Sequence, residues 1–164
     1  MAKPNSPVLE ISELYQVCVV VHDLEKSIEH YRDVLGVGPW ETLEGDSSTF
    51  SDVTYHGRPV EHRFRVGLAM VGPMQLELIQ PVEGDNIFSD FLNEHGEGLH
   101  HLGHARVKNL DEAVERLEKA GFPCLQGARF PGGGYAYMDT TKALGTILEL
   151  LELPEGVPAP GTGQ

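Results

Sequence analysis

The chain contains one sequence pattern twice, and this internal repeat limits its possible folds more than any other feature. Residues 76–80 (LELIQ) and 148–152 (LELLE) each hold a glutamate inside an apolar run. Upstream, an apolar stretch followed by a helix start occurs at residues 14–28 and again at residues 99–114. A charged side chain in an apolar strand must lie in a polar environment, because burial of an unpaired charge is costly. Two related strands can direct their charged side chains into one cavity. The repeat therefore predicts two similar units around a shared site.

The composition limits the size of the protein and the partners that it can bind. With 164 residues, 40% of them hydrophobic, the chain is long enough to bury the core of one domain over residues 1–164. The formal net charge of -13 disfavours nucleic acid and anionic membrane surfaces as partners. No apolar run reaches membrane length and no secretory signal pattern is present, so we expect a cytoplasmic protein. Cys18 and Cys124 form no CxxC pair and are expected to be buried thiols.

The first unit is predicted over residues 12–83. Its β-branched stretch 14–21 is typical of a buried strand, and Asp23 is a natural cap for the amphipathic helix that follows and ends at Gly36. The stretch from residue 40 to 81 has no helical period and is divided by turn residues. It is therefore predicted to form strands of an antiparallel sheet.

The second unit is predicted over residues 98–153, after a linker helix within residues 84–97. It repeats the first unit, with a strand at 99–107 and a helix capped by Asn109. Strands are expected at 135–139 and 146–151, and the Pro- and Gly-rich residues 154–164 are expected to form a flexible tail, like residues 1–7. The whole chain is thus an α+β protein of two tandem βαβββ units.

Strand alternation selects the candidate site. Because neighbouring leucines pack against the helices, Glu77 and Glu149 point to the opposite face of their strands. For each glutamate alone, the solvated face of a half-buried sheet is the favoured interpretation. If the two units are related by a pseudo-twofold axis, however, the carboxylates converge, together with the equivalent residues Gln16 and His101. Three oxygens and one nitrogen suit one divalent ion such as zinc, nickel, cobalt or manganese.

These residues carry a resemblance to the vicinal oxygen chelate superfamily. The paired units, the helix start Asp-Leu-Glu-Lys at residues 23–26, Gly-Leu-His-His at 98–101 and Gly-Thr-Ile-Leu-Glu-Leu at 145–150 resemble that family over almost the whole chain. The superfamily includes glyoxalase I, methylmalonyl-CoA epimerase, extradiol dioxygenases and metal-free bleomycin-binding proteins. The resemblance implies that the curled sheets form a cup-shaped site and that Gln16, Glu77, His101 and Glu149 are its metal ligands.

The ligand set resembles that of glyoxalase I, whereas the sequence around His101 resembles that of the epimerases. Both enzyme types imply a metal-dependent lyase or isomerase, in which a carboxylate removes a proton next to a carbonyl and the ion stabilises the enediolate. Glu149 is the first candidate for this base, and Glu77 or Glu61 is the second. Arg63 and Arg65, predicted on one face of a strand, could receive an anionic substrate group, although a solvated edge also explains them.

Two alternative functions remain at this point. A metal-free protein could use the cup to bind a drug or another small molecule, but four ligand-type residues in register argue against it. An extradiol dioxygenase needs two histidines and a carboxylate around iron. Gln16 replaces one histidine, and strand alternation predicts that His104 faces away from His101. The resemblance also implies a homodimer, and the sequence does not determine whether the cup is shared between chains.

Overall fold

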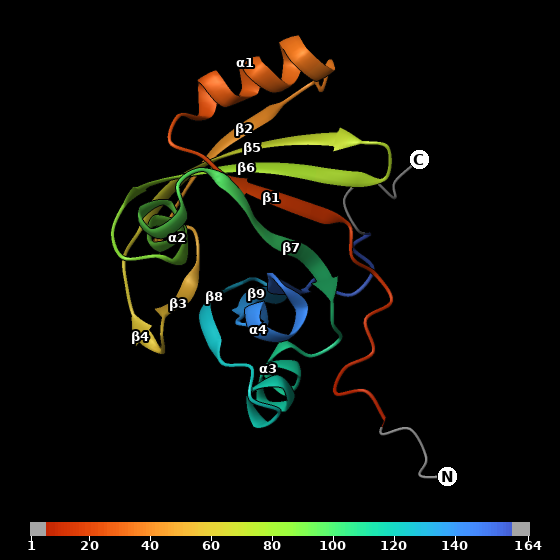
Figure 1. The fold of residues 1–164 in the computed structure, drawn as a ribbon. Helices are drawn as coiled ribbons and strands as arrows, with labels where there is room; N and C mark the ends of the chain where they lie inside the picture. Colours follow the sequence, from red (N-terminus) through yellow and green to blue (C-terminus); the bar gives the residue numbers. More distant parts are fainter. Residues whose placement is uncertain (1–5, 159–164) are drawn as a thin grey trace.

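The computed structural model describes residues 6–158, which form one curled ten-stranded sheet with helices on its outer side (Figure 1). The strand order is β2-β5-β6-β1-β7-β10-β9-β8-β3-β4. In chain order the elements are β1 (Gln16–Val20), α1 (Leu24–Leu35), β2 (Glu41–Asp46), β3 (Ser51–Tyr55), β4 (Arg58–Pro59), β5 (Arg63–Val71), β6 (Met74–Glu83), α2 (Ile87–His95), β7 (Gly98–Arg106), α3 (Leu110–Lys119), β8 (Cys124–Phe130), β9 (Gly133–Met138), α4 (Thr141–Leu144) and β10 (Ile147–Glu152).

The sheet confirms the duplication. The first half, β2-β5-β6-β1, is matched in reverse order by β7-β10-β9-β8, and β1 and β7 pair antiparallel at the centre. Gln16 pairs with Gly103 and Cys18 pairs with His101, so the pseudo-twofold axis passes between these two pairs. Gln16 and His101 are therefore equivalent positions, as predicted, and Cys18 is equivalent to Gly103.

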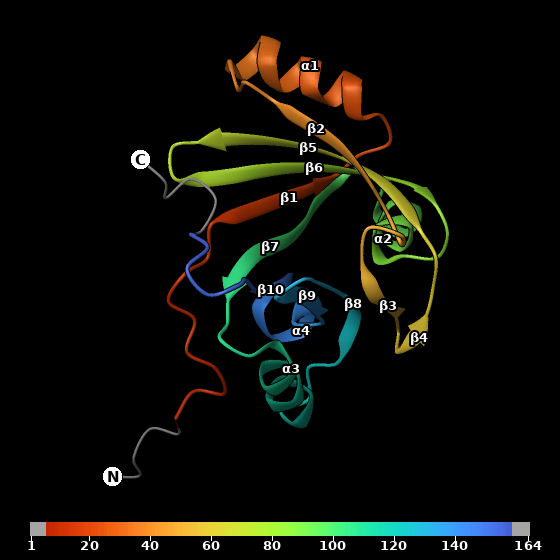
Figure 2. The ribbon, with the colours of Figure 1, turned by 180° about the vertical axis from the view of Figure 1, so that it is seen from behind.

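Each half buries its own helix against the outer face of the sheet. Leu24 of α1 packs with Val21 and Leu78, and Leu110 of α3 packs in a second cluster with Leu150. Asp23 and Asn109 cap these helices by accepting the Lys26 and Glu112 backbone N–H groups, at 3.0 Å and 2.9 Å. Figures 1 and 2 show α1 and α3 at opposite ends of the molecule, which leaves the inner face of the sheet between the halves.

The hairpin β3–β4 breaks the symmetry in a way that the sequence did not predict. It belongs to the first half of the chain, yet β3 pairs with β8 of the second half and extends the sheet beyond it. The Tyr55 hydroxyl donates to Asp90 Oδ2 of α2 at 2.6 Å, and the His56 N–H donates to the Leu125 carbonyl at 2.7 Å. These contacts cover the β8 edge and place the β2–β3 turn at the mouth of the cup.

Two further helices, α2 and α4, lie outside the two helices that pack on the halves. The linker helix is confirmed as α2, capped by Asn86, whereas the one-turn helix α4 was not predicted. Part of the predicted flexible ends, residues 1–5 and 159–164, lies outside the described residues. Among the described residues, no helix is long and apolar enough to cross a membrane.

Candidate active site

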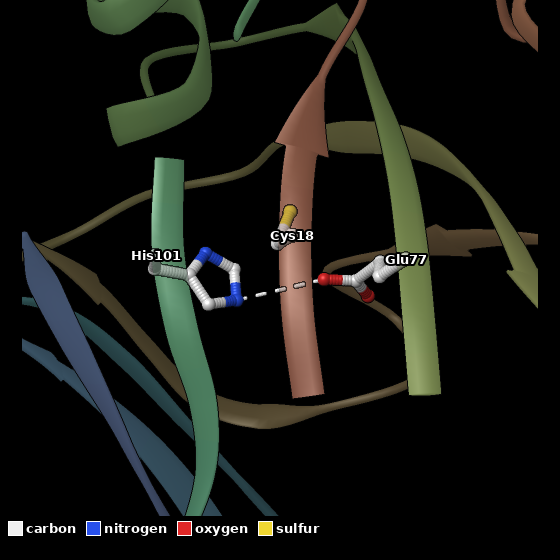
Figure 3. A group of neighbouring side chains, drawn as sticks. All are labelled: Cys18, Glu77 and His101. Carbon is white, nitrogen blue, oxygen red and sulfur yellow. Dashed lines mark ion pairs between the residues drawn. The ribbon is translucent and has the colours of Figure 1, made fainter. Parts of the chain in front are cut away.

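Four predicted side chains from both halves converge on the inner face of the sheet. His101 Nε2 lies 3.4 Å from Gln16 Oε1, 3.6 Å from Glu77 Oε2 and 3.8 Å from Glu149 Oε2. Gln16 and His101 come from the central strands, and the glutamates come from β6 and β10 beside them. Figure 3 shows His101 and Glu77 pointing toward each other across β1. The repeat therefore brings one nitrogen and three oxygens close to a single point.

Burial makes the charges of this cluster costly. The side chains of Glu77 and Glu149 are 13% and 7% exposed, and His101 is fully buried. Burial raises the pKa of both glutamates, and the charge of Glu77 raises the pKa of Glu149 further. Burial also lowers the pKa of His101 well below its usual value, so the imidazole is a neutral nitrogen donor at neutral pH.

These observations fit a bound divalent ion. Glu77 Oε2 is buried and lacks a hydrogen-bond partner among the described residues, and two buried carboxylates lie close to one imidazole. A cation would offset their mutual repulsion and their loss of hydration. The donor set, carboxylates with an imidazole and an amide oxygen, suits zinc, nickel, cobalt or manganese.

Neighbouring side chains orient two of these donors. Gln16 Nε2 donates to Gln75 Oε1 at 2.8 Å, which leaves Gln16 Oε1 directed at His101. His100 Nδ1 and His101 Nδ1 are 2.8 Å apart, so one of these rings must donate to the other. When His101 Nδ1 is the donor, His101 Nε2 keeps its lone pair for the site. Such outer contacts fix the rotamer and tautomer of metal ligands.

The twofold-related pair Gly103 and Cys18 shapes the space around the cluster. A Cβ at Gly103 would lie 2.1 Å from Gln16 Oε1 and 2.6 Å from Glu149 Oε2, so a larger residue would displace both side chains. At the equivalent position, the buried Cys18 thiol faces Glu77 and His101, with the three ligand atoms within 4.8 Å of one another. The sequence correctly predicted a buried thiol but not its position beside the site (Figure 3).

The predicted orientation of His104 is wrong. Its backbone has φ 57°, and the pairing of β7 with β10 shifts register at this point, so simple alternation does not apply. His104 therefore lines the same cavity as Glu149, and its Nε2 lies 3.9 Å from Glu149 Oε2. The His104 backbone N–H also donates to this oxygen, at 3.2 Å, and burial lowers the pKa of His104 to about 4.

Gln16, Glu77 and Glu149 of the cluster line one end of a cavity of about 260 Å³. Aromatic residues that the sequence did not identify form the other end: Phe50 stacks on Phe64 at 6.4 Å and contacts Tyr135 edge-on at 5.5 Å. Alternation along β9 could have indicated Tyr135 and Tyr137, whereas Phe50 lies in a turn without a periodic signal. A larger surface groove, about 1050 Å³, lies along residues 6–13 and α3 and contains no member of the cluster.

Three other predicted site residues do not reach this cavity. The Arg65 guanidinium pairs with Glu25 of α1 and with Glu44, and Arg63 lies 3.7 Å from Glu83. Glu61 is exposed between β4 and β5 and does not line the cavity. Arg65 follows Phe64, which lines the cavity, so alternation places the arginine on the outer face with α1.

The curled sheet of paired units and the buried site on its inner face define a protein of the vicinal oxygen chelate fold. The sequence profile of the Glyoxalase/Bleomycin resistance protein/Dioxygenase superfamily matches residues 15–138, and the chain belongs to this superfamily. The mitochondrial methylmalonyl-CoA epimerase of Mus musculus is 32% identical over 117 residues, covering 70% of this chain and 57% of the mouse protein. The uncharacterized protein YqjC of Bacillus subtilis is 26% identical, covering 89% of this chain and 95% of YqjC.

Solved structures show the same fold. The methylmalonyl-CoA epimerase of Mycobacterium tuberculosis matches with a TM-score of 0.62 at 24% identity, covering 92% of this chain and 90% of that protein. A methylmalonyl-CoA epimerase of Streptomyces coelicolor, in complex with 2-nitronate-propionyl-CoA, matches with a TM-score of 0.66 at 18% identity and with coverage of 92% and 100%. At these identities the likeness concerns the fold alone.

Proposed function

We propose that the protein is a divalent-metal-dependent isomerase or lyase that moves a proton on a carbon next to a carbonyl group. The observation that carries this proposal is the convergence of Glu77 and Glu149 with Gln16 near the neutral imidazole of His101. Relatedness to methylmalonyl-CoA epimerases over part of their length supports an epimerase-type reaction.

The four ligand side chains would hold zinc, nickel, cobalt or manganese, which would supply positive charge opposite the carbonyl oxygen of the substrate. Glu149 is the proposed base, because its carboxylate lines the cavity that a substrate would occupy, where it can reach a proton next to the carbonyl. The substrate C–H bond breaks, Glu149 takes the proton, and the electron pair moves onto the carbonyl oxygen. The His104 N–H holds Glu149 Oε2 in position during this step.

Glu77, on the twofold-related strand, is the proposed second carboxylate. Its Oε2 is 3.6 Å from His101 Nε2, on the side of the cluster opposite the β10 strand that carries Glu149. A carboxylate from the second half could receive or return a proton on the other side of the planar intermediate. Glu61 is not proposed for this step because it lies outside the cavity.

The proposal is tested by exchange of substrate protons with D₂O, followed by NMR, on 2-oxo compounds and acyl thioesters. Protein reloaded with zinc or nickel should catalyse exchange, and the same protein after chelation should not. The matched control is Glu155→Gln, an exposed carboxylate that does not line the cavity. Tight small-molecule binding without bound metal and without exchange would instead indicate the metal-free binding protein.

Iron-dependent dioxygenase chemistry is a second candidate, supported by one observation. His104 lines the cavity 3.9 Å from Glu149, so the site holds two histidines and a carboxylate, the donor types of non-haem iron oxygenases. Oxygen uptake by iron(II)-loaded protein in the presence of a catechol distinguishes this candidate. We expect no oxygen uptake, because Gln16 and Glu77 also point into the cluster.

The homodimer and the cytoplasmic location of this protein remain predictions from its sequence.

A further inference from the structure

The cavity has two chemically different ends. At the polar end lie the carboxylates of Glu77 and Glu149 and the amides of Gln16 and Gln75. The opposite end is apolar and largely aromatic, and its rings are packed against one another: Phe50 with Phe64 at 6.4 Å and 22°, and Phe50 with Tyr135 at 5.5 Å and 88°. A ligand that fills about 260 Å³ must therefore contact both ends.

Within residues 6–158, the lining offers no permanently charged cation to an anionic substrate, and its one imidazole, that of His104, lies beside Glu149. Of the described residues that line this cavity, none is a lysine or an arginine. The neighbouring Arg65 is held outside the cup by Glu25 and Glu44. A divalent ion and the two glutamates sum to no net charge, so an additional carboxylate would make the buried end negative.

We propose that the cup binds a neutral carbonyl compound with an aromatic or bulky apolar substituent, and that it selects against substrates that carry a free carboxylate there. This inference rests on the proposed function. The carbonyl and an adjacent oxygen would lie at the cluster of Gln16, Glu77, His101 and Glu149, and the substituent would stack on the aromatic end. A methylmalonyl thioester, whose acyl group is anionic, is a poor fit.

Phe50 is the specificity-determining residue of this proposal, and Leu43 offers a rim position where a charge can be introduced. Phe50 lies in the β2–β3 turn and contacts a ring from each half, Phe64 of β5 and Tyr135 of β9. Leu43 of β2 lines the cavity but is 41% exposed, so its position tolerates a longer side chain without disrupting the core. Neither residue is part of the ligand cluster.

The experiment compares two ligands that differ mainly in charge, 2-hydroxyacetophenone and benzoylformate. Both place two adjacent oxygens next to a phenyl ketone, but only benzoylformate is an anion. Binding to zinc-loaded protein is measured by calorimetry, and 2-hydroxyacetophenone and methylmalonyl-CoA are also followed by proton exchange in D₂O. The neutral ligand should bind about tenfold tighter or more, because Glu77 and Glu149 already balance the charge of the ion and an added carboxylate would leave a buried net negative charge.

Leu43→Arg tests the charge argument directly. An arginine at the cup rim should raise the affinity for benzoylformate relative to that for 2-hydroxyacetophenone by about fivefold, as expected for a partly exposed charge pair. The matched control Leu43→Gln, long and neutral, should leave the ratio of the two affinities as it is in the parent protein. Phe50→Ala should weaken 2-hydroxyacetophenone binding by about fivefold through the loss of stacking. A Leu43→Arg protein that binds both ligands as the parent does would contradict the charge argument.

The outcomes separate this inference from the proposed function. If 2-hydroxyacetophenone binds tighter but exchanges no proton, the substrate class stands and the proposed reaction fails. If methylmalonyl-CoA exchanges its proton and benzoylformate binds at least as tightly as the neutral ligand, the reaction stands and the substrate class is wrong. Failure of both phenyl ketones to bind zinc-loaded protein would also overturn the substrate class.

Discussion

The two halves of the molecule share their ligand positions but differ in the residues around them. Gln16 and Glu77 in the first half are matched by His101 and Glu149 in the second. At the next equivalent pair, however, the second half has Gly103, where a Cβ would strike Gln16 and Glu149, and the first half has Cys18. The duplication therefore explains why the ligand side chains converge. Local differences between the two halves determine which of these side chains have space around them.

The halves also differ in how they border the cup. The first half extends the hairpin β3–β4 across to β8, and the second half has no such extension among the described residues. The turn that precedes this hairpin places Phe50 in contact with Tyr135 of the second half. The first half thus provides part of the cavity wall next to the second half, whereas the second half provides the proposed base.

The largest effect should come from comparing the two glutamates. Glu149→Gln should lower proton exchange by about a hundredfold to ten-thousandfold, because the amide cannot accept the proton. Glu77→Gln should lower metal affinity. At saturating metal it should lower the rate of proton exchange by a smaller factor than Glu149→Gln does. Exchange rates and metal affinities of both variants, with Glu155→Gln as the control, test this. Equal losses from the two variants would mean that the halves share the proton-transfer role.

The second comparison uses the positions that differ between the halves. Gly103→Ala should weaken metal binding by about tenfold to a hundredfold, since its Cβ would displace Gln16 and Glu149. Cys18→Ala, the equivalent site, removes atoms rather than adding them and should change metal affinity by less than about threefold. Competition with a chromophoric chelator measures both. A Gly103→Ala protein with parental affinity would show that the close approach is not needed for the site.

The pH dependence of stability separates the glutamates from the histidines. Glu77 and Glu149 have raised pKa values, so in the metal-free protein their contribution to stability is lost as pH rises through the folded-state values. The pKa values of His100 and His104 are lowered to about 4, so their contribution is instead lost as pH falls below 6.5, the ordinary histidine value.

Metal-free protein should therefore lose stability as pH rises above about 6.5, where histidines are neutral in both states and only the glutamates still titrate. Added zinc should remove most of this loss, and Glu149→Gln should make the curve flatter. Urea unfolding at several pH values measures the effect. Stability that stays level above pH 6.5 in metal-free protein would contradict the burial of two uncompensated carboxyl groups.

The smallest effect concerns the hairpin that only the first half has. Tyr55→Phe removes the hydroxyl that donates to Asp90, and should lower the free energy of unfolding by about 1 kcal/mol. Hydrogen exchange should rise in β3 and β4 more than in β6, because the lost contact ties the hairpin to α2. Tyr31→Phe on α1 serves as a control for loss of a tyrosine hydroxyl. Equal exchange in all three strands would show that the hairpin is held by its pairing with β8.

Much of this arrangement was predictable because it follows from periodicity and repetition. The capped helices α1 and α3 and the inward direction of Glu77 and Glu149 depend on local spacing, which the sequence shows. The orientation predicted for His104 is wrong because a register shift and a positive φ interrupt the simple alternation of side chains along the strand. Pairing of β3 with β8 depends on contacts between distant segments, for which no local pattern exists.

The central claim is that side chains from both halves hold one divalent ion, and metal stoichiometry tests it most directly. Protein purified without chelator and incubated with zinc or nickel should contain one ion per chain after desalting. His101→Ala in the second half and Glu77→Ala in the first should each reduce this content strongly while the circular dichroism spectrum stays unchanged. Absence of stoichiometric metal, or full retention by either folded variant, would contradict the claim.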